Sequence, residues 1–470
     1  MSVPGWVQDA VFYQIFPDRF ANGDPTNDPS NRQPWGEKPT IWGFQGGDLQ
    51  GVSQRLDYLV DLGINAIYLN PIFQATSNHR YNTSDYYRID PGLGSMADFK
   101  TLVHEAHQRG LRILLDGVFN HCGRGFFAFN DVMENQEHSP YCDWFHIKQF
   151  PLEAYHPGDA ENYLGWWKYK SLPKFNTDNP RVRRFIFDVA RYWIDQGIDG
   201  WRLDVPNEID NDGFWAEFRQ VVKQANPEAY LLGEIWDIAP RWVGPDHFDG
   251  LMNYPLRDAL IQLISTGSKS AQDFKDFLGS LLGAYPRENT YAHYLALGSH
   301  DTPRLATLLK GDRRKLELLY LILFSYPGAP AIYYGDEIGL EGRKDPDSRR
   351  AFTWDESTWD HDLRNYIRQL IQLRRETAEL RSGEVRLLSC EAAGVVALAR
   401  QGLHSTSLLV FNATEESLDV RLPVVALDWP EGQVVDELIH HTRLLVSDGK
   451  LGLHLTPFQG LLLRNRPGMG

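Results

Sequence analysis

Short apolar runs alternate with amphipathic stretches along roughly the first 380 residues of the chain. Eight runs have the length and continuous apolar character of strands buried on both faces. They lie at residues 10–16, 64–69, 111–119, 197–205, 229–236, 248–254, 294–300 and 328–337. Amphipathic stretches between them, such as 97–110 and 180–197, end in glycine, the usual residue after a helix C-terminus. Eight buried strands alternating with helices predict an α/β fold, a (β/α)8 TIM barrel rather than an open sheet.

Two intervals break this pattern. From about 122 to 174 the chain is rich in aromatic residues, Gly, Pro and His, without a clean helical period, which predicts a small subdomain inserted after the third strand. After about residue 380 the texture changes to short runs that alternate apolar and polar residues, which predicts an antiparallel β-sandwich. We therefore expect a barrel domain over 1–380, with the insert at 122–174, and a C-terminal β-domain over 381–470.

The charge balance narrows the choice of partners. The 470 residues include 47 basic and 62 acidic ones, which gives a net charge of −15. This balance disfavours nucleic acids and anionic membranes, since both bind basic surfaces. No run of about 18 apolar residues predicts a membrane span. The 14 Trp and 21 Tyr either fill cores or offer faces on which sugar rings stack.

The cysteines and the first residues indicate a compartment. Cys122, Cys142 and Cys390 show neither zinc spacing nor a disulfide framework, so we expect reduced, structural thiols. The first 14 residues lack the basic region and apolar core of a secretory signal, which favours a cytoplasmic protein. No G-x-G-x-x-G follows a predicted strand, so neither a nucleotide nor a redox cofactor is expected.

Polar residues gather where four predicted strands end, and in a (β/α)8 barrel that face carries the active site. A single Asp there would be a helix cap or a structural ion pair as often as a functional group. Several carboxylates crowded into one cleft are costly, however, which makes function the better explanation. The segments are DGVFNH (Asp116, Asn120, His121), GWRLDVPNE (Arg202, Asp204, Glu208), GEIWD (Glu234, Trp236) and GSHDTPR (His300, Asp301, Arg304).

This set of groups suits the hydrolysis of glycosides. One carboxylate attacks the anomeric carbon, and a second, kept protonated, gives its proton to the leaving oxygen. Arg202 lies two residues before Asp204, on the same side of a strand, where it would lower the pKa of that carboxyl and favour a nucleophile. Glu234 stands beside apolar residues that would raise its pKa, which suits the acid/base. Asp301 would then steady the oxocarbenium-like charge.

These four segments resemble, in the right order, the signature segments of the α-amylase family of retaining glycoside hydrolases. The resemblance covers essentially the whole chain. It implies a nucleophile at Asp204, an acid/base at Glu234 and a transition-state stabiliser at Asp301. It also implies that the sugar at the cleavage point is bound by Asp116, His121, Arg202 and His300, with Tyr81 of HRYNTSDY stacked below it.

Within that family the chain is most similar to cyclomaltodextrinases, neopullulanases and maltogenic amylases. LPKFN at 172–176, VPNE at 205–208 and DPDSRR at 345–350 resemble segments of those enzymes. The resemblance implies that Asp345 and Arg349 hold sugars further from the cleavage point, and that Trp236 and Glu208 lie on the leaving-group side. A solvated ion pair within a loop is the alternative for Asp345 and Arg349.

The chain also departs from those enzymes. They usually carry an extra N-terminal β-domain that builds a dimer and closes the cleft, whereas here the barrel begins at residues 6–11. Pro206 and Asn82 replace the usual Ala and Asp. A monomer and a homodimer are therefore both open. So are two activities, α-1,4 hydrolysis of maltooligosaccharides and cyclodextrins, with or without transglycosylation, and α-1,6 hydrolysis of short branched maltooligosaccharides. Sucrose- or trehalose-converting activity and a non-catalytic binding module rank lower.

One polar loop has the composition of a metal site. The stretch FANGDPTNDPSN and the GGD that follows offer carboxylate, amide and carbonyl oxygens, which suit Ca²⁺ better than a transition metal. The stretch resembles the first calcium site of neopullulanase-like amylases. That likeness implies a structural calcium with the ligands Asn22, Asp24, Asn27, Asp28, Gly46 and Asp48. The alternative is a turn that its own Asx side chains tie to the backbone.

Overall fold

The computed structural model describes residues 2–465 and confirms the predicted barrel. All neighbouring strands of its first sheet run parallel, in the order β8-β7-β6-β5-β2-β1-β10-β9. A parallel bridge between Met252 and Tyr294 joins the two ends of this order and closes the barrel. Each strand falls within a predicted run: β1 (Phe12–Ile15), β2 (Ala66–Leu69), β5 (Arg112–Gly117), β6 (Gly200–Leu203), β7 (Tyr230–Gly233), β8 (Gly250–Leu251), β9 (Tyr294–Ala296) and β10 (Ala329–Tyr333).

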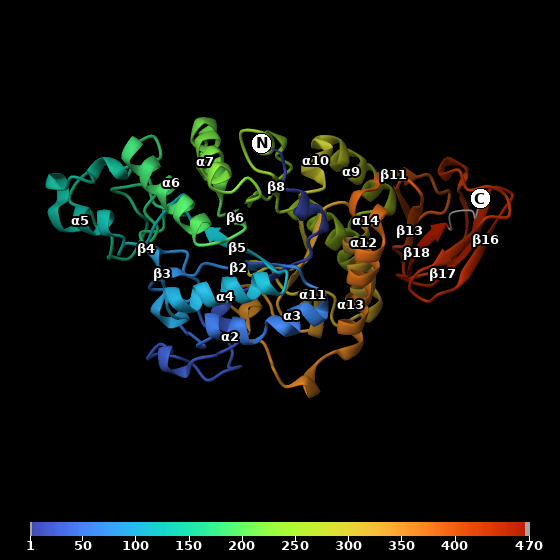
Figure 1. The fold of residues 1–470 in the computed structure, drawn as a ribbon, viewed down its shortest axis with the longest axis horizontal. Coiled ribbons are helices and arrows are strands. Elements are labelled where there is room, and N and C mark those ends of the chain that lie inside the picture. The colour runs from blue at the N-terminus through green and yellow to red at the C-terminus, as the bar shows by residue number, and fades with distance from the viewer. Residues whose placement is uncertain (1, 466–470) are drawn as a thin grey trace.

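Helices cover the outside of this sheet (Figure 1). The two predicted helices form as α4 (Met96–Gln108) and α6 (Pro180–Asp195), and the glycines after them, Gly110 and Gly197, have positive φ. The other helices are α1 (Pro17–Phe20), α2 (Leu49–Gln54), α3 (Leu56–Leu62), α7 (Asp212–Ala225), α8 (Tyr254–Leu260), α9 (Ala271–Ala284), α10 (Arg287–Thr290), α11 (Leu305–Leu308), α12 (Arg313–Ser325), α13 (His361–Glu376) and α14 (Ala378–Ser382).

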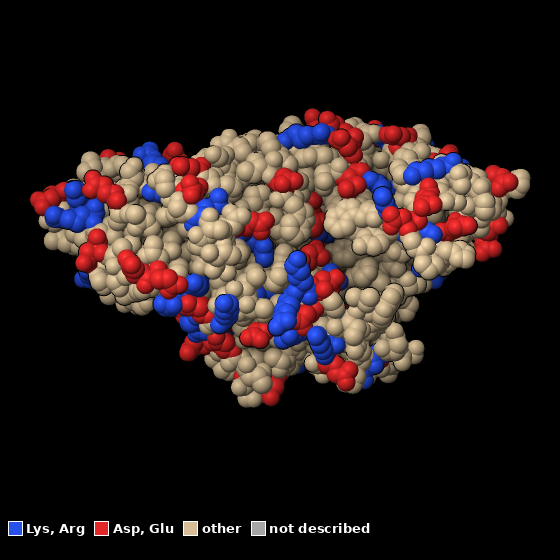
Figure 2. Space-filling model, turned by 180° about the vertical axis from the view of Figure 1, so that it is seen from behind, with Lys and Arg blue, Asp and Glu red and all other residues tan. Residues whose placement is uncertain are grey.

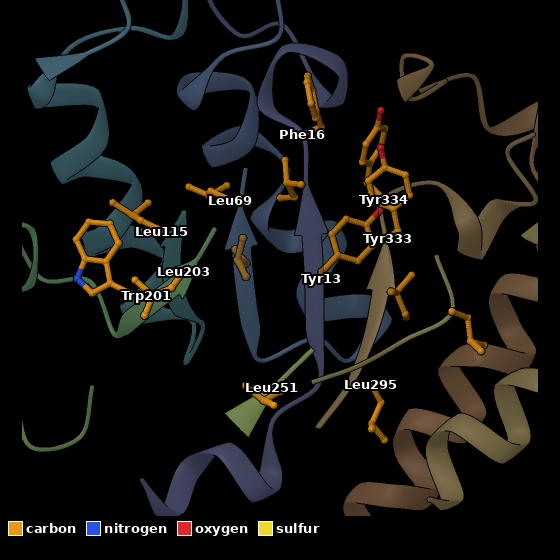
Figure 3. Packing of buried hydrophobic residues seen from close by; sticks show 14 of the residues in the cluster. Tyr13, Phe16, Leu69, Leu115, Trp201, Leu203, Leu251, Leu295, Tyr333 and Tyr334 are labelled. Atoms are coloured by element: carbon orange, nitrogen blue, oxygen red, sulfur yellow. The ribbon is translucent and has the colours of Figure 1, made fainter. Parts of the chain in front are cut away.

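Alternation along the strands divides the core into two layers. In β1, Phe12 belongs to a cluster inside the barrel, together with Tyr230 and Tyr294. Its neighbours Tyr13 and Ile15 belong to the main core between the strands and the helices. Figure 3 shows that outer layer, with Tyr13, Leu69, Leu203 and Leu295 around the strands. Inward positions near the C-terminal strand ends are therefore free to carry polar side chains.

The insert after the third barrel strand, β5, lies at the far end of the molecule from the C-terminal domain (Figure 1). Contrary to the expectation of no helical period, it contains α5 (Phe127–Asn135), which buries Ala128, Phe129 and Val132. That apolar face is short and lies among aromatic residues, so its period is hard to recognise. A hairpin of β3 (Phe73–Ala75) and β4 (Thr83–Ile89), which the pattern did not predict, precedes α4.

The C-terminal domain is antiparallel, as predicted, and packs around its own apolar core, which includes Val395, Leu422 and Trp429. Its strand order is β11-β12-β13-β18-β15-β16-β17-β14. Strands β11, β15 and β16 are partly exposed. The strands are β11 (Glu384–Leu388), β12 (Val395–Gln401), β13 (Thr406–Asn412), β14 (Leu418–Pro423), β15 (Val434–Glu437), β16 (Arg443–Ser447), β17 (Lys450–Leu455) and β18 (Gly460–Asn465).

The surface has mixed charge (Figure 2), and the three cysteines are not paired. On the face drawn in Figure 2, Lys and Arg are interspersed with Asp and Glu rather than gathered in one broad basic area. None of the helices within residues 2–465 has the length and apolar character that crossing a bilayer requires. Cys122, Cys142 and Cys390 are free thiols, and Cys122 is buried.

Candidate active site

The strand register places the predicted polar residues side by side. Asp116, near the end of β5, pairs in register with Arg202 of β6. Asp204 follows Arg202 by two residues and so extends from the same face of the chain. Glu234 follows the last residue of β7, the strand next to β6. The C-terminal strand ends thus bring these four side chains together, as the sequence predicted.

Arg202 is the centre of the cluster and is fully buried. Its Nη1 lies 2.7 Å from Oδ1 of Asp116 and 3.0 Å from Oδ1 of Asp204. Its Nη2 lies 2.7 Å from Oε1 of Glu234. One guanidinium is therefore shared by three carboxyl groups, all of them buried. So many acids around one cation shift proton affinities strongly.

The pKa values follow from this imbalance. Burial raises the pKa of Glu234 to about 7, with Arg202 opposing the rise, which confirms the direction expected from its apolar neighbours. Burial also raises the pKa of Asp204 well above its usual range. Arg202 does lower the pKa of Asp204, as the sequence suggested, but burial outweighs it, so the expected net direction is wrong. The cluster therefore holds a proton near neutral pH, shared between coupled carboxyl groups.

A second layer of hydroxyl groups surrounds Asp116. Its Oδ2 accepts hydrogen bonds from the hydroxyl groups of Tyr68, at 2.6 Å, and Tyr81, at 2.9 Å. The Tyr81 ring stacks on His300, with ring centroids 5.5 Å apart and an angle of 9°. Tyr81 Oη lies 2.6 Å from His300 Nε2. Tyr81 and His300 are thus held in fixed orientations beside the carboxyl cluster.

Asp301 faces this cluster from the segment after β9. Its Oδ2 lies 3.1 Å from His300 Nε2, and its Oδ1 lies 3.2 Å from Arg349 Nη2. Burial acts to raise the pKa of Asp301, but His300 and Arg349 outweigh it and lower the pKa. Burial lowers the pKa of His300 to about 3, so that ring is neutral near pH 7. The cations that keep Asp301 ionised are therefore Arg349, which contacts it, and Arg202.

Arg349 also contacts Asp345, the other outer residue of its segment. Its Nη1 lies 3.1 Å from Asp345 Oδ1, and its Nε donates to the carbonyl of His300 at 3.0 Å. The Arg349 side chain is only 10% exposed. The Asp345 side chain is 43% exposed, so this pair lies at the edge of the site, where Arg349 links Asp345 to Asp301.

The backbone after Asp204 is strained. Val205 has φ 36° and ψ 51°, a left-handed conformation that is costly for a β-branched residue, above all before proline. Its N–H donates to Glu234 Oε2 at 3.1 Å. Pro206 begins a short turn that ends at Glu208, whose Oε2 lies 2.8 Å from Nζ of Lys174 in the insert. Strain of this kind is typical of functional sites.

Two aromatic contacts mark the outer parts of the site. Trp236, 42% exposed, stacks on buried Tyr254 with ring centroids 3.7 Å apart. His121 is buried, and its ring stacks on Trp166 of the insert at 5.3 Å. The described structure thus brings the predicted inner residues together and places Trp236 and Glu208 on neighbouring loops.

Sequence reasoning missed several polar residues that support the site. Gln14 of β1 lies with its Nε2 2.9 Å from His300 Nδ1 and 3.0 Å from Asn70 Oδ1. Asn70 donates to Tyr81 Oη at 3.1 Å. Because the Gln14 amide nitrogen donates, Nδ1 of His300 accepts and its Nε2 carries the hydrogen. The available signal was a lone polar residue within an apolar run, Gln14 in FYQIF, or directly after one, Asn70 in IYLN.

The predicted calcium loop follows β1 and the short helix α1, and it ends at Asp48, the N-cap of α2. Asp48 is fully buried and accepts hydrogen bonds from backbone N–H groups of Gly23, Asp24 and Gly51. The side-chain NH2 groups of Asn22 and Asn27 donate to Asp28 and Asp48.

The amide oxygens of Asn22 and Asn27 are the signs of a cation site in this loop. Both are buried and have no hydrogen-bond partner among the described residues. A Cβ at Gly46 would lie 2.3 Å from Asp28 Oδ1, so only glycine allows that close approach. Within residues 2–465, no three His, Cys, Asp or Glu side chains gather into a metal-binding group, so any cation here would need these amides. The donor set fits Ca²⁺, although Asp24 turns its carboxylate to Thr26.

A scan against protein-family models matches residues 14–382 to "Alpha amylase, catalytic domain". Among curated proteins, the cyclomaltodextrinase of Geobacillus thermopakistaniensis is 45% identical over 97% of this chain and 77% of its own length.

Solved structures of similar length also match. The cyclic alpha-maltosyl-(1→6)-maltose hydrolase from Arthrobacter globiformis is 40% identical, with a TM-score of 0.90 over 99% of this chain and 100% of that chain. The debranching enzyme from Nostoc punctiforme is also 40% identical, with a TM-score of 0.87 over 98% of this chain and 99% of that chain.

Proposed function

The chain belongs to the alpha-amylase family of glycoside hydrolases, and from this premise we propose that it hydrolyses α-1,4 bonds of maltooligosaccharides and cyclodextrins with retention of configuration. One observation carries the proposal: a single guanidinium, Arg202, joins Asp116, Asp204 and Glu234 at the strand ends. Two carboxyl groups bridged in this way suit the short separation, about 5–5.5 Å, that retaining enzymes use.

In the first step, the Asp204 carboxylate attacks the anomeric carbon while the protonated Glu234 gives its proton to the departing oxygen. A covalent glycosyl ester forms on Asp204, and the leaving sugar departs as an alcohol. The raised pKa of Glu234, about 7, supports its role as the acid. When that proton resides on Glu234, Asp204 keeps its contact with Arg202 as an anion.

In the second step, Glu234, now a carboxylate, removes a proton from water. The hydroxide attacks the anomeric carbon, and the ester bond to Asp204 breaks. The Val205 N–H and Arg202 stabilise the ionised Glu234 that this step requires. A sugar hydroxyl in place of water would give transglycosylation through the same intermediate.

The remaining residues hold the substrate. Asp301, kept ionised by Arg349, faces the positive charge that develops on the sugar ring. Tyr81, His300, Asp116 and His121 form the wall around the cleaved unit. We assign Asp345 and Arg349 to sugars beyond it, and Trp236 and Glu208 to the leaving-group side.

A second candidate is α-1,6 hydrolysis of short branched or cyclic maltooligosaccharides. Two enzymes named for such activities are similar to this chain over nearly their whole length, with TM-scores of 0.90 and 0.87. Pro206 supports it, since it lies between Asp204 and Glu208 and would shape the leaving-group side.

Product analysis separates these candidates. The purified protein is incubated with maltoheptaose, β-cyclodextrin, pullulan and a branched maltooligosaccharide, and the first-formed anomer is followed by NMR. We expect α-anomeric products from the first two substrates. Turnover only of the α-1,6-containing substrates would favour the second candidate. A β-anomer formed first, or no turnover at all, would contradict retaining hydrolysis.

We also propose that the loop over residues 22–48 binds a structural Ca²⁺ through Asn22, Asp24, Asn27, Asp28, Gly46 and Asp48. The orphaned amide oxygens of Asn22 and Asn27 support it most directly, because buried polar atoms normally have partners. The ion would brace the segment after β1 and takes no part in the chemistry.

The three free cysteines further support a reducing, cytoplasmic location.

A further inference from the structure

A cavity of about 190 Å³ lies at the N-terminal face of the barrel, opposite the carboxyl cluster. Asp9 and Asn65, which line it, come just before β1 and β2. Arg374 and Arg375 of α13 and Arg381 of α14 line it from the other side. A space of this size has room for several water molecules or a small polyatomic ion.

The charges around this cavity do not balance. The three arginines face one carboxylate, Asp9, which pairs with Arg381. Neither Arg374 nor Arg375 forms an ion pair with any described residue. Arg374 is also 1% exposed, so its charge lies in the protein interior without an acidic partner. A buried charge that lacks a counter-charge is costly.

Hydrogen bonds compensate Arg374 only in part. Its Nη1 donates to the carbonyls of Leu380 at 2.8 Å and Phe324 at 3.2 Å, and its Nη2 donates to those of Gly328 at 2.6 Å and Gln8 at 3.5 Å. The Nε atoms of Arg374 and Arg381, however, are buried and have no hydrogen-bond partner among the described residues. Burial, together with the nearby charges of Arg400 and Arg381, lowers the pKa of Arg374 to about 9. A nearby anion would act against each of these effects.

We propose that this cavity binds a small tetrahedral oxyanion of the phosphate or sulfate class, held by Arg374, Arg375 and Arg381. Guanidinium groups match such ions because their N–H donors form paired, charge-assisted hydrogen bonds. The ion would link the segment before β1 to the ends of α13 and α14, and so stabilise the fold. Its place at the N-terminal face keeps it away from the proposed chemistry, and it does not depend on the proposed function.

The test uses inorganic phosphate and the full chain. Calorimetric titration and thermal unfolding are measured at fixed pH and ionic strength, with sodium chloride as the reference salt. We expect saturable binding and a rise in Tm with phosphate and with sulfate, but not with chloride. Glucose 1-phosphate serves as a further arm. If glucose 1-phosphate binds as tightly as inorganic phosphate, the site accepts a phosphate ester. If it binds more weakly, the natural ligand is the free ion.

Matched variants make the site falsifiable. Arg375→Gln should weaken phosphate binding at least about tenfold, since it removes a charged donor. Arg368→Gln, on the same helix but paired with Asp61, should bind as the wild type does. Asp9→Asn removes the competing carboxylate and should tighten binding several-fold, a gain that mere destabilisation cannot produce. Equal effects of phosphate and chloride, or wild-type binding by Arg375→Gln, would overturn the proposal.

Discussion

At the C-terminal ends of the barrel strands one guanidinium serves three carboxyl groups, whereas at the N-terminal ends three guanidinium groups face one carboxylate. The apolar cluster around Phe12, Tyr230 and Tyr294 lies within the barrel between these two faces. Both ends therefore carry unbalanced charge, of opposite sign, and the buried part of it at the basic end is the charge of Arg374.

The two imbalances are relieved in different ways. Excess carboxyl groups relieve their repulsion by holding a proton, and a proton held near neutral pH is what an acid catalyst needs. Arginine does not lose its proton under ordinary conditions, so excess guanidinium is relieved by an anion instead. The acidic end is thus suited to chemistry and the basic end to binding.

The largest effect should come from removing the nucleophile at the acidic end. Asp204→Asn should lower kcat/KM by about 10⁴-fold or more, since no carboxylate remains to form the covalent ester. Asp210→Asn, an exposed acid nearby that pairs with Arg241, should leave kcat/KM unchanged. Substantial activity in Asp204→Asn would remove Asp204 from the mechanism.

The next effect concerns the proton that the acidic end holds. Because Glu234 must be protonated to act as the acid, kcat/KM should fall as pH rises through about 7, the pKa to which burial raises this group. Glu234→Gln should lose about 10²–10⁴-fold in activity together with this basic limb. The loss should be smaller for an aryl glucoside whose leaving group needs no protonation. A basic limb that persists in Glu234→Gln would assign it to another group.

A smaller effect should follow when the acidic end loses its second cation. Arg349→Gln removes the guanidinium beside Asp301, so the pKa of Asp301 should rise and kcat/KM should fall about ten- to hundredfold. Arg350→Gln offers a matched control, because Arg350 pairs with Asp347 instead. Equal kinetics for the two variants would show that Asp301 does not need this partner.

The smallest effect should be on stability. The calcium proposed for the loop after β1 would bind at the acid-rich, C-terminal face of the barrel, whereas the proposed oxyanion would bind at the N-terminal face. EDTA should lower Tm by several degrees, and added Ca²⁺ should restore it. Asn27→Ala should abolish that response, whereas Asn31→Ala, an exposed residue of the same loop, should retain it. If EDTA does not change Tm, the loop does not bind calcium and is only an Asx-rich turn.

Much of the acidic end could be predicted from the sequence because strand ends share one face of a barrel. The runs before Asp116, Asp204 and Glu234 are buried strands, so their order alone brought these residues together. The pKa direction of Asp204 could not be predicted, because it depends on how deeply the cluster is buried rather than on the spacing to Arg202.

The basic end escaped prediction for a different reason. Arg374 and Arg375 lie in an ordinary amphipathic helix, and only tertiary packing brings them to Asp9, more than 360 positions away in the chain. Gln14 and Asn70 were missed because a single polar residue within an apolar run also suits a satisfied core position.

The most direct test of the central claim is to trap the covalent intermediate and locate it. The protein, or its Glu234→Gln variant, is treated with a fluorinated α-glucosyl fluoride that forms the ester faster than it is hydrolysed, and the peptides are analysed by mass spectrometry. We predict one added glycosyl group, on the carboxyl of Asp204. A label on any other residue, or turnover without a covalent adduct, would contradict the account.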